Sequence, residues 1–180
     1  MSLIGWWPLH RAQGKALDMS GNGNHGTHNG TTRGVAGVGG LQATSFSSNE
    51  NISIPSFGSL SSFTVSGWAR FNQINTSGVN GVTNIRKDNV ALFQEKDGKL
   101  KYFARDNGGF FEVASEPAST DKWYQFVITY DGSKHSLYIN GSESGSTNGG
   151  NTGQGEQNTL GSRVDGSAGL DGKIAGVRIY

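Results

Sequence analysis

Hydrophobic residues alternate with small or polar residues along much of the chain. Residues 63–71 (FTVSGWARF) follow this pattern, and so do residues 172–180 (GKIAGVRIY). A period of two is typical of a strand with one face buried and the other exposed. No long stretch has the 3.6-residue period of an amphipathic helix. We count about a dozen strands, which is enough for two packed antiparallel sheets.

Turn signals separate the strand-like segments. Residues 97–98 (DG) lie between two such segments, and residues 140–141 (NG) follow another. Both dipeptides favour tight hairpins, because the turn needs positive φ angles. Residues 106–109 (DNGG) predict a further hairpin of the same kind.

Two predictions concern the second half of the chain. Residues 145–155 consist almost entirely of Gly, Asn, Ser and Thr, and this low complexity indicates a mobile surface loop. Residues 172–180 form the last alternating segment. We expect this closing strand to pair beside the strand-like segment at residues 4–9.

The composition fits one all-β domain that spans residues 1–180. The chain has 29 Gly, a residue that is unfavourable in helices and common in turns. Four Trp, nine Phe and five Tyr offer enough apolar area for a core, which argues against a disordered chain. Cysteine is absent, so packing must stabilise the fold without disulfides.

The charge and the hydrophobicity of the chain exclude two classes of binding partner. The net charge is +1 and no run of Lys and Arg exceeds two residues, so we expect no nucleic-acid binding. No run reaches the roughly 18–20 apolar residues that span a bilayer, so we expect no membrane insertion. The chain opens with strand-like sequence where a signal peptide would stand. We therefore expect an excised domain, or a protein that leaves a cytoplasm by another route, located outside the cell or on a virion surface.

Several segments, in this order and spacing, resemble the laminin-G-like jelly-roll domains of the concanavalin A-like superfamily. The resemblance implies a two-sheet antiparallel jelly-roll sandwich. The family usually carries acidic residues just before the final Val-Arg-Ile-Tyr, where this chain has Ala175 and Gly176. Any role of those carboxylates is therefore in doubt for this chain. The matching segments are residues 5–9 (GWWPL), 17–26 (LDMSGNGNHG), 63–68 (FTVSGW), 122–132 (KWYQFVITYDG), 137–141 (LYING), 159–161 (TLG) and 172–180.

The segment at residues 18–26 is a candidate calcium site. Asp, Asn and backbone carbonyl groups in a Gly-rich turn supply the hard oxygen ligands that Ca²⁺ prefers. The resemblance implies a structural calcium near this loop, and Asp18, Asn22 and Asn24 are its candidate local ligands. Because Asp18 is the single carboxylate in the segment, a further ligand must come from elsewhere in the chain, and Asp171 is the candidate. The alternative interpretation is an ordinary turn, in which Asp and Asn side chains bind their own backbone.

Catalytic signatures are weak. The related β-glucanases place three carboxylates on one strand, but the nearest match here, Glu95 and Asp97, has Leu100 at the third position. Glu112 and Glu116 form the other close pair, and a proline follows Glu116. There is no Gly-x-Ser-x-Gly motif. We predict that the protein is not an enzyme.

The four histidines fit surface positions better than a zinc site. They form no His-Glu-x-x-His motif, and no Cys is available as a further ligand. Residues 25 and 28 are three apart, which would put them on opposite faces of a strand.

Aromatic residues are candidates for a glycan platform or for the core. We interpret Trp68 and Trp123 as core residues, because both lie in regular strands. Trp6 and Trp7 are adjacent, so one should face inward and the other outward. One residue of the pair at 110–111 is a candidate for an exposed stacking platform. The candidate ligand-binding residues are Phe110, Phe111, Arg105, Asn107, Arg163 and Asp165, with a solvated hairpin as the alternative.

Three functions remain open from the sequence. The first is a non-catalytic carbohydrate-binding or adhesion module, on a virion or cell surface, whose partner is a glycan or a surface protein. The second is a structural virion protein that contacts protein neighbours, with a broad apolar patch and a homo-oligomer or larger assembly. The third, and least favoured, is a degenerate glycoside hydrolase, which would need two carboxylates about 5–9 Å apart.

Overall fold

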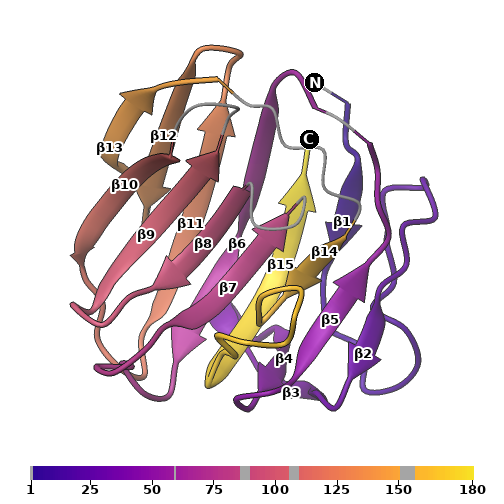
Figure 1. The fold of residues 1–180 in the computed structure, drawn as a ribbon. Coiled ribbons are helices and arrows are strands. Elements are labelled where there is room, and N and C mark those ends of the chain that lie inside the picture. The colour runs from indigo at the N-terminus through magenta and orange to yellow at the C-terminus, as the bar shows by residue number, and fades with distance from the viewer. Residues whose placement is uncertain (1, 59, 86–89, 106–109, 151–156) are drawn as a thin grey trace.

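The computed structural model describes residues 2–58, 60–85, 90–105, 110–150 and 157–180. It is a sandwich of two antiparallel sheets, which confirms the predicted all-β jelly-roll class (Figure 1). The eight-stranded sheet runs in the order β13 (Ser142–Asn148), β12 (Lys134–Ile139), β11 (Trp123–Tyr130), β6 (Phe63–Phe71), β15 (Gly172–Ile179), β4 (Gln42–Phe46) and β3 (Thr32–Ala36), with β1 (Gly5–Trp7) paired to β15.

The second sheet lies in front of the first in Figure 1. A single turn of 3₁₀ helix, Val38–Gly40, joins β3 to β4. No helix in the described ranges is long and apolar enough to cross a membrane. The seven-stranded sheet runs in the order β10 (Phe110–Pro117), β9 (Lys99–Arg105), β8 (Val90–Gln94), β7 (Asn80–Ile85), β14 (Asn158–Leu160), β5 (Asn51–Ile54) and β2 (Thr27–Asn29).

Alternation in β6 and β11 places every second side chain in the core between the sheets. Phe63, Val65 and Phe71 of β6 are buried, and so is Phe126 of β11. Burying each of these side chains contributes about 1.5–3 kcal/mol to the stability of the folded state. The residues between them face outward from the eight-stranded sheet, and most of these are polar.

The predicted core positions of Trp68 and Trp123 are wrong. Both residues are only partly buried, because they occupy the outward positions of β6 and β11. Strand parity decides this: residue 68 shares a face with residues 64, 66 and 70, all of which are polar. The prediction for the N-terminal pair is confirmed, since Trp7 is fully buried and Trp6 is partly exposed.

The structure confirms two predicted hairpins and corrects one loop. Gly98 has φ +82° in the turn between β8 and β9, and Asn140 and Gly141 have φ +52° and +82° between β12 and β13. Residues 145–148 belong to β13 and pair with β12, so this part of the predicted mobile loop is wrong. Residues 151–156 of that loop and the hairpin at residues 106–109 lie outside the described residues.

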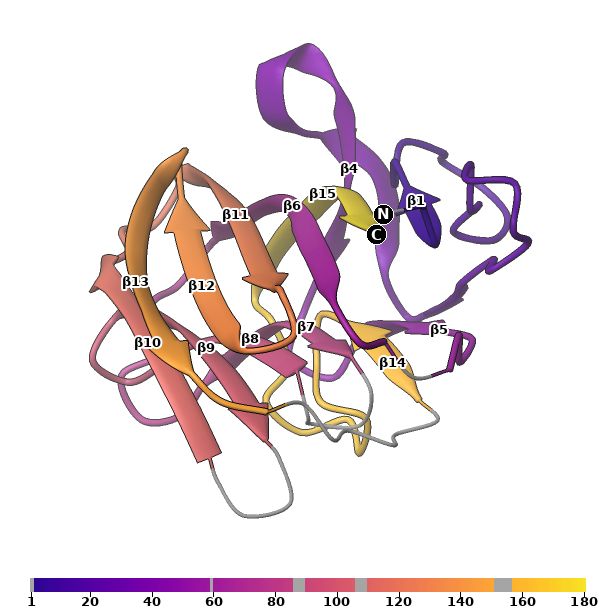
Figure 2. The ribbon, with the colours of Figure 1, turned by 90° about the horizontal axis from the view of Figure 1, so that it is seen from above.

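The pairing of the closing strand with the N-terminal strand is confirmed. Trp6 pairs with Arg178 and Trp7 with Val177, and the two ends of the chain lie side by side in Figures 1 and 2. A bulge interrupts β15 at Gly176, whose φ of +60° suits glycine. The backbone N–H of Gly176 donates to the carbonyl oxygen of Pro8, 3.2 Å away.

One histidine is a core residue, which corrects the expectation that all four lie on the surface. His135 is fully buried, and its ring stacks on Tyr130 at 4.3 Å between centroids. Its Nε2 lies 3.1 Å from the carbonyl oxygen of Gly150, which can only accept, so Nδ1 accepts from the Tyr102 hydroxyl at 2.7 Å. Burial, together with nearby Tyr130, raises the pKa of Tyr102 far above its ordinary value.

Candidate functional site

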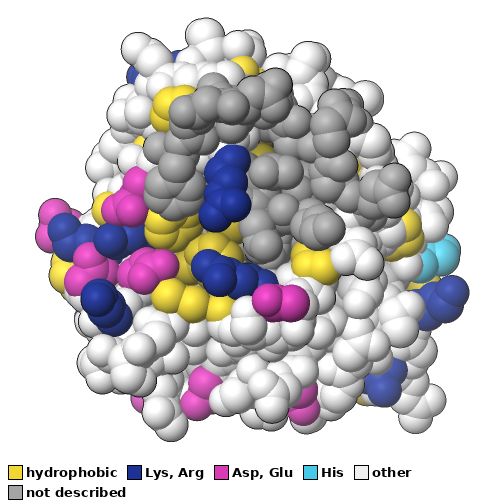
Figure 3. Space-filling view, in the orientation of Figure 1, with side chains coloured by type: hydrophobic (Ala, Val, Ile, Leu, Met, Phe, Trp, Pro, Cys, Tyr) yellow, Lys and Arg dark blue, Asp and Glu magenta, His cyan; other side chains and the backbone are white. Residues whose placement is uncertain are grey.

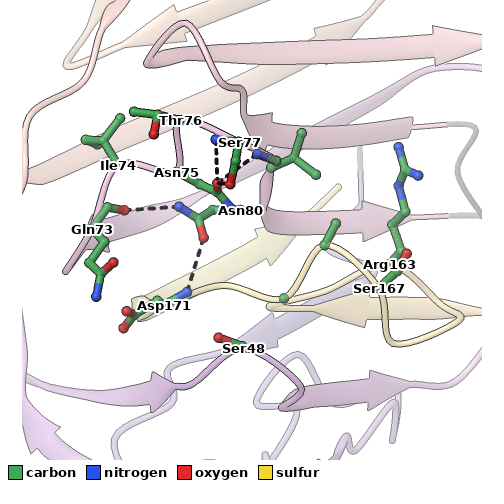
Figure 4. Close-up of a pocket in the computed structure, with 14 residues that line it drawn as sticks. Ser48, Gln73, Ile74, Asn75, Thr76, Ser77, Asn80, Arg163, Ser167 and Asp171 are labelled. Carbon is green, nitrogen blue, oxygen red and sulfur yellow. Dashed lines mark hydrogen bonds between the residues drawn. The ribbon is translucent and has the colours of Figure 1, made fainter.

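A cavity of about 680 Å³ opens at one end of the sandwich, and we call it the rim pocket (Figure 4). Its walls are the turn between β6 and β7 and the loop that joins β14 to β15. Most of the lining side chains are polar, and Ile74 and Val79 add apolar surface. The polar lining residues are Ser48, Gln73, Asn75, Thr76, Ser77, Asn80, Arg163, Ser167 and Asp171.

The fully buried amide of Gln94 holds the first wall in place. Its Oε1 accepts from the backbone N–H of Asn75 at 2.9 Å and from Nδ2 of Asn80 at 2.6 Å. Its Nε2 donates to the carbonyl oxygen of Asn75 at 3.3 Å. Gln94 stands at the end of β8, so the turn is fixed to a central strand of the sheet. A buried amide whose donor and acceptor are both used rigidifies the backbone around it.

Asn80 and Asp171 connect the two walls. Asn80 Nδ2 donates to the carbonyl oxygen of Gln73 at 3.1 Å, and Asn80 Oδ1 accepts from the backbone N–H of Asp171 at 3.4 Å. Asp171 Oδ1 in turn accepts from Asn72 Nδ2 at 2.9 Å. The pocket is therefore lined by amide groups and a carboxylate whose positions are set before any ligand arrives.

The second wall depends on a very close backbone approach. A Cβ atom on Gly169 would lie only 1.4 Å from the carbonyl oxygen of Ser48, so only glycine fits there. The backbone N–H of Gly81 donates to the carbonyl oxygen of Ala168 at 2.7 Å, which ties the loop to β7. The guanidinium of Arg163 lies 5.0 Å from the Phe93 ring centroid, a cation–π contact that directs this side chain over the sheet.

The structure brings together two residues that were predicted for different roles. Arg163, a predicted glycan ligand, and Asp171, a predicted calcium ligand, both line the rim pocket. Asp165 lies in the same loop, where its Oδ1 accepts from the Ser167 backbone N–H at 2.9 Å and hydroxyl at 2.6 Å. These hydrogen bonds lower the pKa of the Asp165 carboxyl.

The other predicted ligand residues lie apart from the rim pocket. Arg105 is exposed and pairs with Phe110 between β9 and β10, at the edge of the seven-stranded sheet. The side chain of Phe110 and the whole of Asn107 lie outside the described residues. Phe111 packs inward, with its ring 5.9 Å from that of His135, so it is not an exposed stacking platform.

The carboxylate of Asp18 is surrounded by donors. Its Oδ1 accepts from the backbone N–H groups of Trp6 and Ser20, each at 2.9 Å. Its Oδ2 accepts from the Asn24 backbone N–H at 2.9 Å and the Ser20 hydroxyl at 2.8 Å. Burial alone would raise the pKa of this carboxyl, but these hydrogen bonds lower it below the ordinary value. Asp18 thus braces the loop against β1.

The four predicted calcium ligands do not assemble into one site. Asn22 and Asn24 turn their amide N–H groups toward the carbonyl oxygens of Leu3 and Ile4, at 2.8–3.0 Å. Trp6 pairs with Arg178 of β15, and Asp171 comes seven residues before Arg178. Asp171 is therefore roughly 20 Å away along the strand. In this conformation the loop does not fit a calcium ion. Among the described residues no three His, Asp or Glu side chains form a metal-binding cluster.

Comparison with known sequences settles the family. A sequence profile of the concanavalin A-like lectin/glucanases superfamily matches residues 46–180. The chain belongs to this superfamily. No curated protein matches the sequence.

Three solved structures illustrate the range of proteins that share this superfamily fold. Domain 4 of AbnA, an extracellular arabinanase of glycoside hydrolase family 43 from Geobacillus stearothermophilus, was solved with arabinotriose; it has a TM-score of 0.76 and 20% identity over 99% of this chain and 91% of its own. The binding domain of botulinum neurotoxin DC, solved with rat synaptotagmin II, has a TM-score of 0.71 and 14% identity. Trypanosoma rangeli sialidase also has a TM-score of 0.71 and 14% identity.

The likeness to these three structures shows the fold. In both the neurotoxin and the sialidase comparison, 99% of this chain is aligned. The aligned part is 48% of the neurotoxin domain and 30% of the sialidase. Enzymes and binding domains both occur among them, so the superfamily alone does not assign an activity to this chain.

Sequence reasoning missed the amides that build the rim pocket. Asn75 and Asn80 stand in an Asn- and Ser-rich stretch that looks like any other turn. Gln94 gave the clearest signal, because it ends the otherwise hydrophobic run at residues 90–93. A polar residue that continues a buried strand must find hydrogen-bond partners, and here those partners shape the pocket.

Proposed function

We propose that this chain is a non-catalytic glycan-binding module and that the rim pocket is its binding site. The observation that carries the proposal is the hydrogen-bond network of buried Gln94 and Asn80, which holds the two pocket walls, and with them the backbone of Asp171, in place before any ligand binds. Sugar hydroxyls both donate and accept hydrogen bonds, so a mixed set of amides, a guanidinium and a carboxylate is complementary to them. Preorganised groups bind with less ordering cost.

The size and lining of the pocket support this assignment. A volume of about 680 Å³ lies within the usual range of small-ligand sites and would hold a short oligosaccharide. Ile74 and Val79 offer apolar surface for the C–H face of a sugar ring. Arabinotriose binding by the AbnA domain gives a precedent on the same fold.

The lack of catalytic activity is part of the proposal. Glycoside hydrolysis normally needs two carboxyl groups about 5–9 Å apart around the scissile bond. Asp171 is the single carboxylate among the described residues that line the rim pocket. The pair at Glu95 and Asp97 belongs to a hairpin, where Asp97 Oδ1 accepts from the Lys99 backbone N–H at 3.1 Å. We place the module outside the cell, where its glycan ligands would be.

A glycan array tests the proposal, with arabinotriose included among the ligands. We expect binding to one glycan class, followed by at least a tenfold loss of affinity in Arg163→Ala, measured by calorimetry. The matched control is Arg11→Ala, which removes an exposed arginine that does not line the rim pocket. We also expect binding to persist in chelator, because the Asp18 loop does not fit calcium.

Two outcomes would contradict the proposal. An array without binding, with the protein folded, would favour the structural role, and light scattering should then reveal a defined homo-oligomer. Equal affinities of wild type and Arg163→Ala would place the glycan elsewhere on the molecule.

A further inference from the structure

The outer face of the eight-stranded sheet carries a stripe of tryptophans. Of the four Trp in the chain, Trp7 faces the core. The other three, Trp6 on β1, Trp68 on β6 and Trp123 on β11, occupy outward positions and are partly exposed. We call these three residues the tryptophan stripe.

Strand register places the stripe on one diagonal. Trp68 pairs with Gln125 and Trp123 pairs with Arg70, so the two tryptophans are on neighbouring strands and two positions apart. Trp6 pairs with Arg178 of β15, which lies between β1 and β6. With about 4.8 Å between strands and 3.3 Å per residue, the stripe is about 20 Å long.

A groove of about 410 Å³ contains part of the stripe. Trp6 and Trp68 line it together with Leu41 and Met19, which are 67% and 48% exposed. In the described part of the chain, these two are the large hydrophobic side chains classed as exposed. Leu41 comes from the hairpin of β3 and β4, which stands away from the body of the sandwich in Figure 2. Exposed apolar surface of this kind marks an interaction site.

The β15 bulge borders the groove beside the tryptophan stripe. Gly176 lines the groove next to Trp68, where a Cβ atom would make only an ordinary contact with the indole at 3.8 Å. The guanidinium of Arg178 lies 5.0 Å from the Trp6 ring centroid, a cation–π contact that leaves a charged donor group beside the groove.

Basic side chains lie beside the tryptophan stripe. Lys173, Arg70 and Arg178 share the outward side of their strands with the tryptophan stripe. Asp121 pairs with Arg70 at 2.5 Å, whereas Lys173 Nζ donates to the backbone carbonyl oxygen of Ala36 at 3.2 Å. Between the rings stand small polar or amide side chains, including Ser66 and Gln125.

We propose that this face is a second binding surface, and that its ligand is an acidic polysaccharide chain. The C–H faces of successive sugars would stack on Trp6, Trp68 and Trp123, as flat rings stack on aromatic side chains. The carboxylates of the chain would lie near Lys173 and Arg178. The three rings form a narrow diagonal with polar and basic side chains between them. This arrangement follows a single extended chain better than the broad patch of about 800 Å² per partner that a stable protein interface buries.

Native affinity electrophoresis tests this surface with polymers of known charge. We expect polygalacturonate and alginate to retard the wild-type protein and neutral galactan to retard it much less. Trp68→Ala should weaken retardation at least tenfold, and Trp68→Phe should retain part of it because a ring remains. The control is Arg163→Ala in the rim pocket, which should be retarded like the wild type.

Tryptophan fluorescence gives a second readout. Oligogalacturonate should change the emission of the wild type more than that of Trp68→Ala, since Trp7 is buried and the rim pocket has no tryptophan among its lining residues. The proposal fails if neither acidic polymer retards the protein, if galactan retards it equally, or if folded Trp68→Ala behaves like the wild type. It extends glycan binding to a second surface, and the variants at residues 68 and 163 let each proposal fail alone.

Discussion

The two sheets of the sandwich differ in what lies on their outer faces. On the seven-stranded sheet, Ala91, Phe93 and Phe103 point away from the main core, yet they are buried under Val79 and Ala168. Figure 3 views this side of the molecule, where hydrophobic side chains and Lys and Arg gather near the centre. On the eight-stranded sheet, the tryptophan stripe occupies the equivalent outward positions and remains partly exposed.

The difference shows that strand parity alone does not determine burial. Every strand has an outward side, and hydrophobic residues there either form a second small core or remain accessible. Over β7 and β8 the outcome depends on the loop that joins β14 to β15, which folds back over the sheet through Gly169. Large hydrophobic residues on the outward side of an uncovered strand are candidates for binding.

The largest expected difference in stability is between two variants that each truncate one aromatic residue, one on the covered outer face of the seven-stranded sheet and one on the open outer face of the eight-stranded sheet. Phe93→Ala should lower the free energy of unfolding by about 3 kcal/mol, because it leaves a cavity in a packed cluster. Trp68→Ala should lower it by no more than about 1 kcal/mol, because the side chain is already partly exposed. Urea unfolding of both variants measures the contrast. Similar losses for the two would remove the distinction between the covered and the open face.

An intermediate effect on stability is expected at Asp18, which accepts a hydrogen bond from the backbone of Trp6 in the N-terminal strand β1. Asp18→Asn should lower the free energy of unfolding by about 2 kcal/mol at pH 7, since a buried carboxylate loses charge-assisted hydrogen bonds. The folded protein lowers the pKa of Asp18, so this contribution exists above the unfolded-state pKa of about 3.9 and is lost as pH falls through the folded value. Unfolding measured from pH 7 to pH 3 should show the gap between wild type and variant narrowing below about pH 4. A gap independent of pH would show that the charge of Asp18 does not matter.

The smallest effect concerns the ion pair between Arg70 and Asp121. Asp121→Asn should change the free energy of unfolding by less than about 0.5 kcal/mol, because exposed ion pairs contribute little. Asn also tolerates the positive φ of +62° at this position. The same variant removes a negative charge from the open face, so retardation by polygalacturonate should increase. Weaker retardation would argue against an electrostatic role for this face.

Much of the fold could be predicted from the sequence, because the rules involved are local. Alternation fixed which segments become strands, and the dipeptides at residues 97–98 and 140–141 fixed two hairpins. The strand β13 was missed, since its Ser, Thr and Gly residues carry no hydrophobic pattern and are paired through their backbone.

The candidate site could be predicted only in part. Arg163 and Asp171 were singled out separately, but their meeting depends on the register of β15 and on the close packing of Gly169 against the Ser48 backbone, which leaves no room for a Cβ atom. Asp18 was recognised as important from its Gly- and Asn-rich surroundings. Whether its oxygens face a cation or backbone N–H groups depends on how the loop docks on β1, which no local pattern specifies.

The position of β15 has a consequence for how the protein folds. This strand comes last of the fifteen in sequence, but it lies inside the eight-stranded sheet and contacts β6, β4 and β1. These pairings join residues more than a hundred positions apart, so their loop-closure entropy must be overcome before they stabilise anything. Until residues 172–179 emerge from the ribosome, β6 presents an unpaired edge and β1 has no partner strand. Closure of this sheet therefore waits for the last of its strands and is slow, in the range of milliseconds to seconds typical of non-local β topologies.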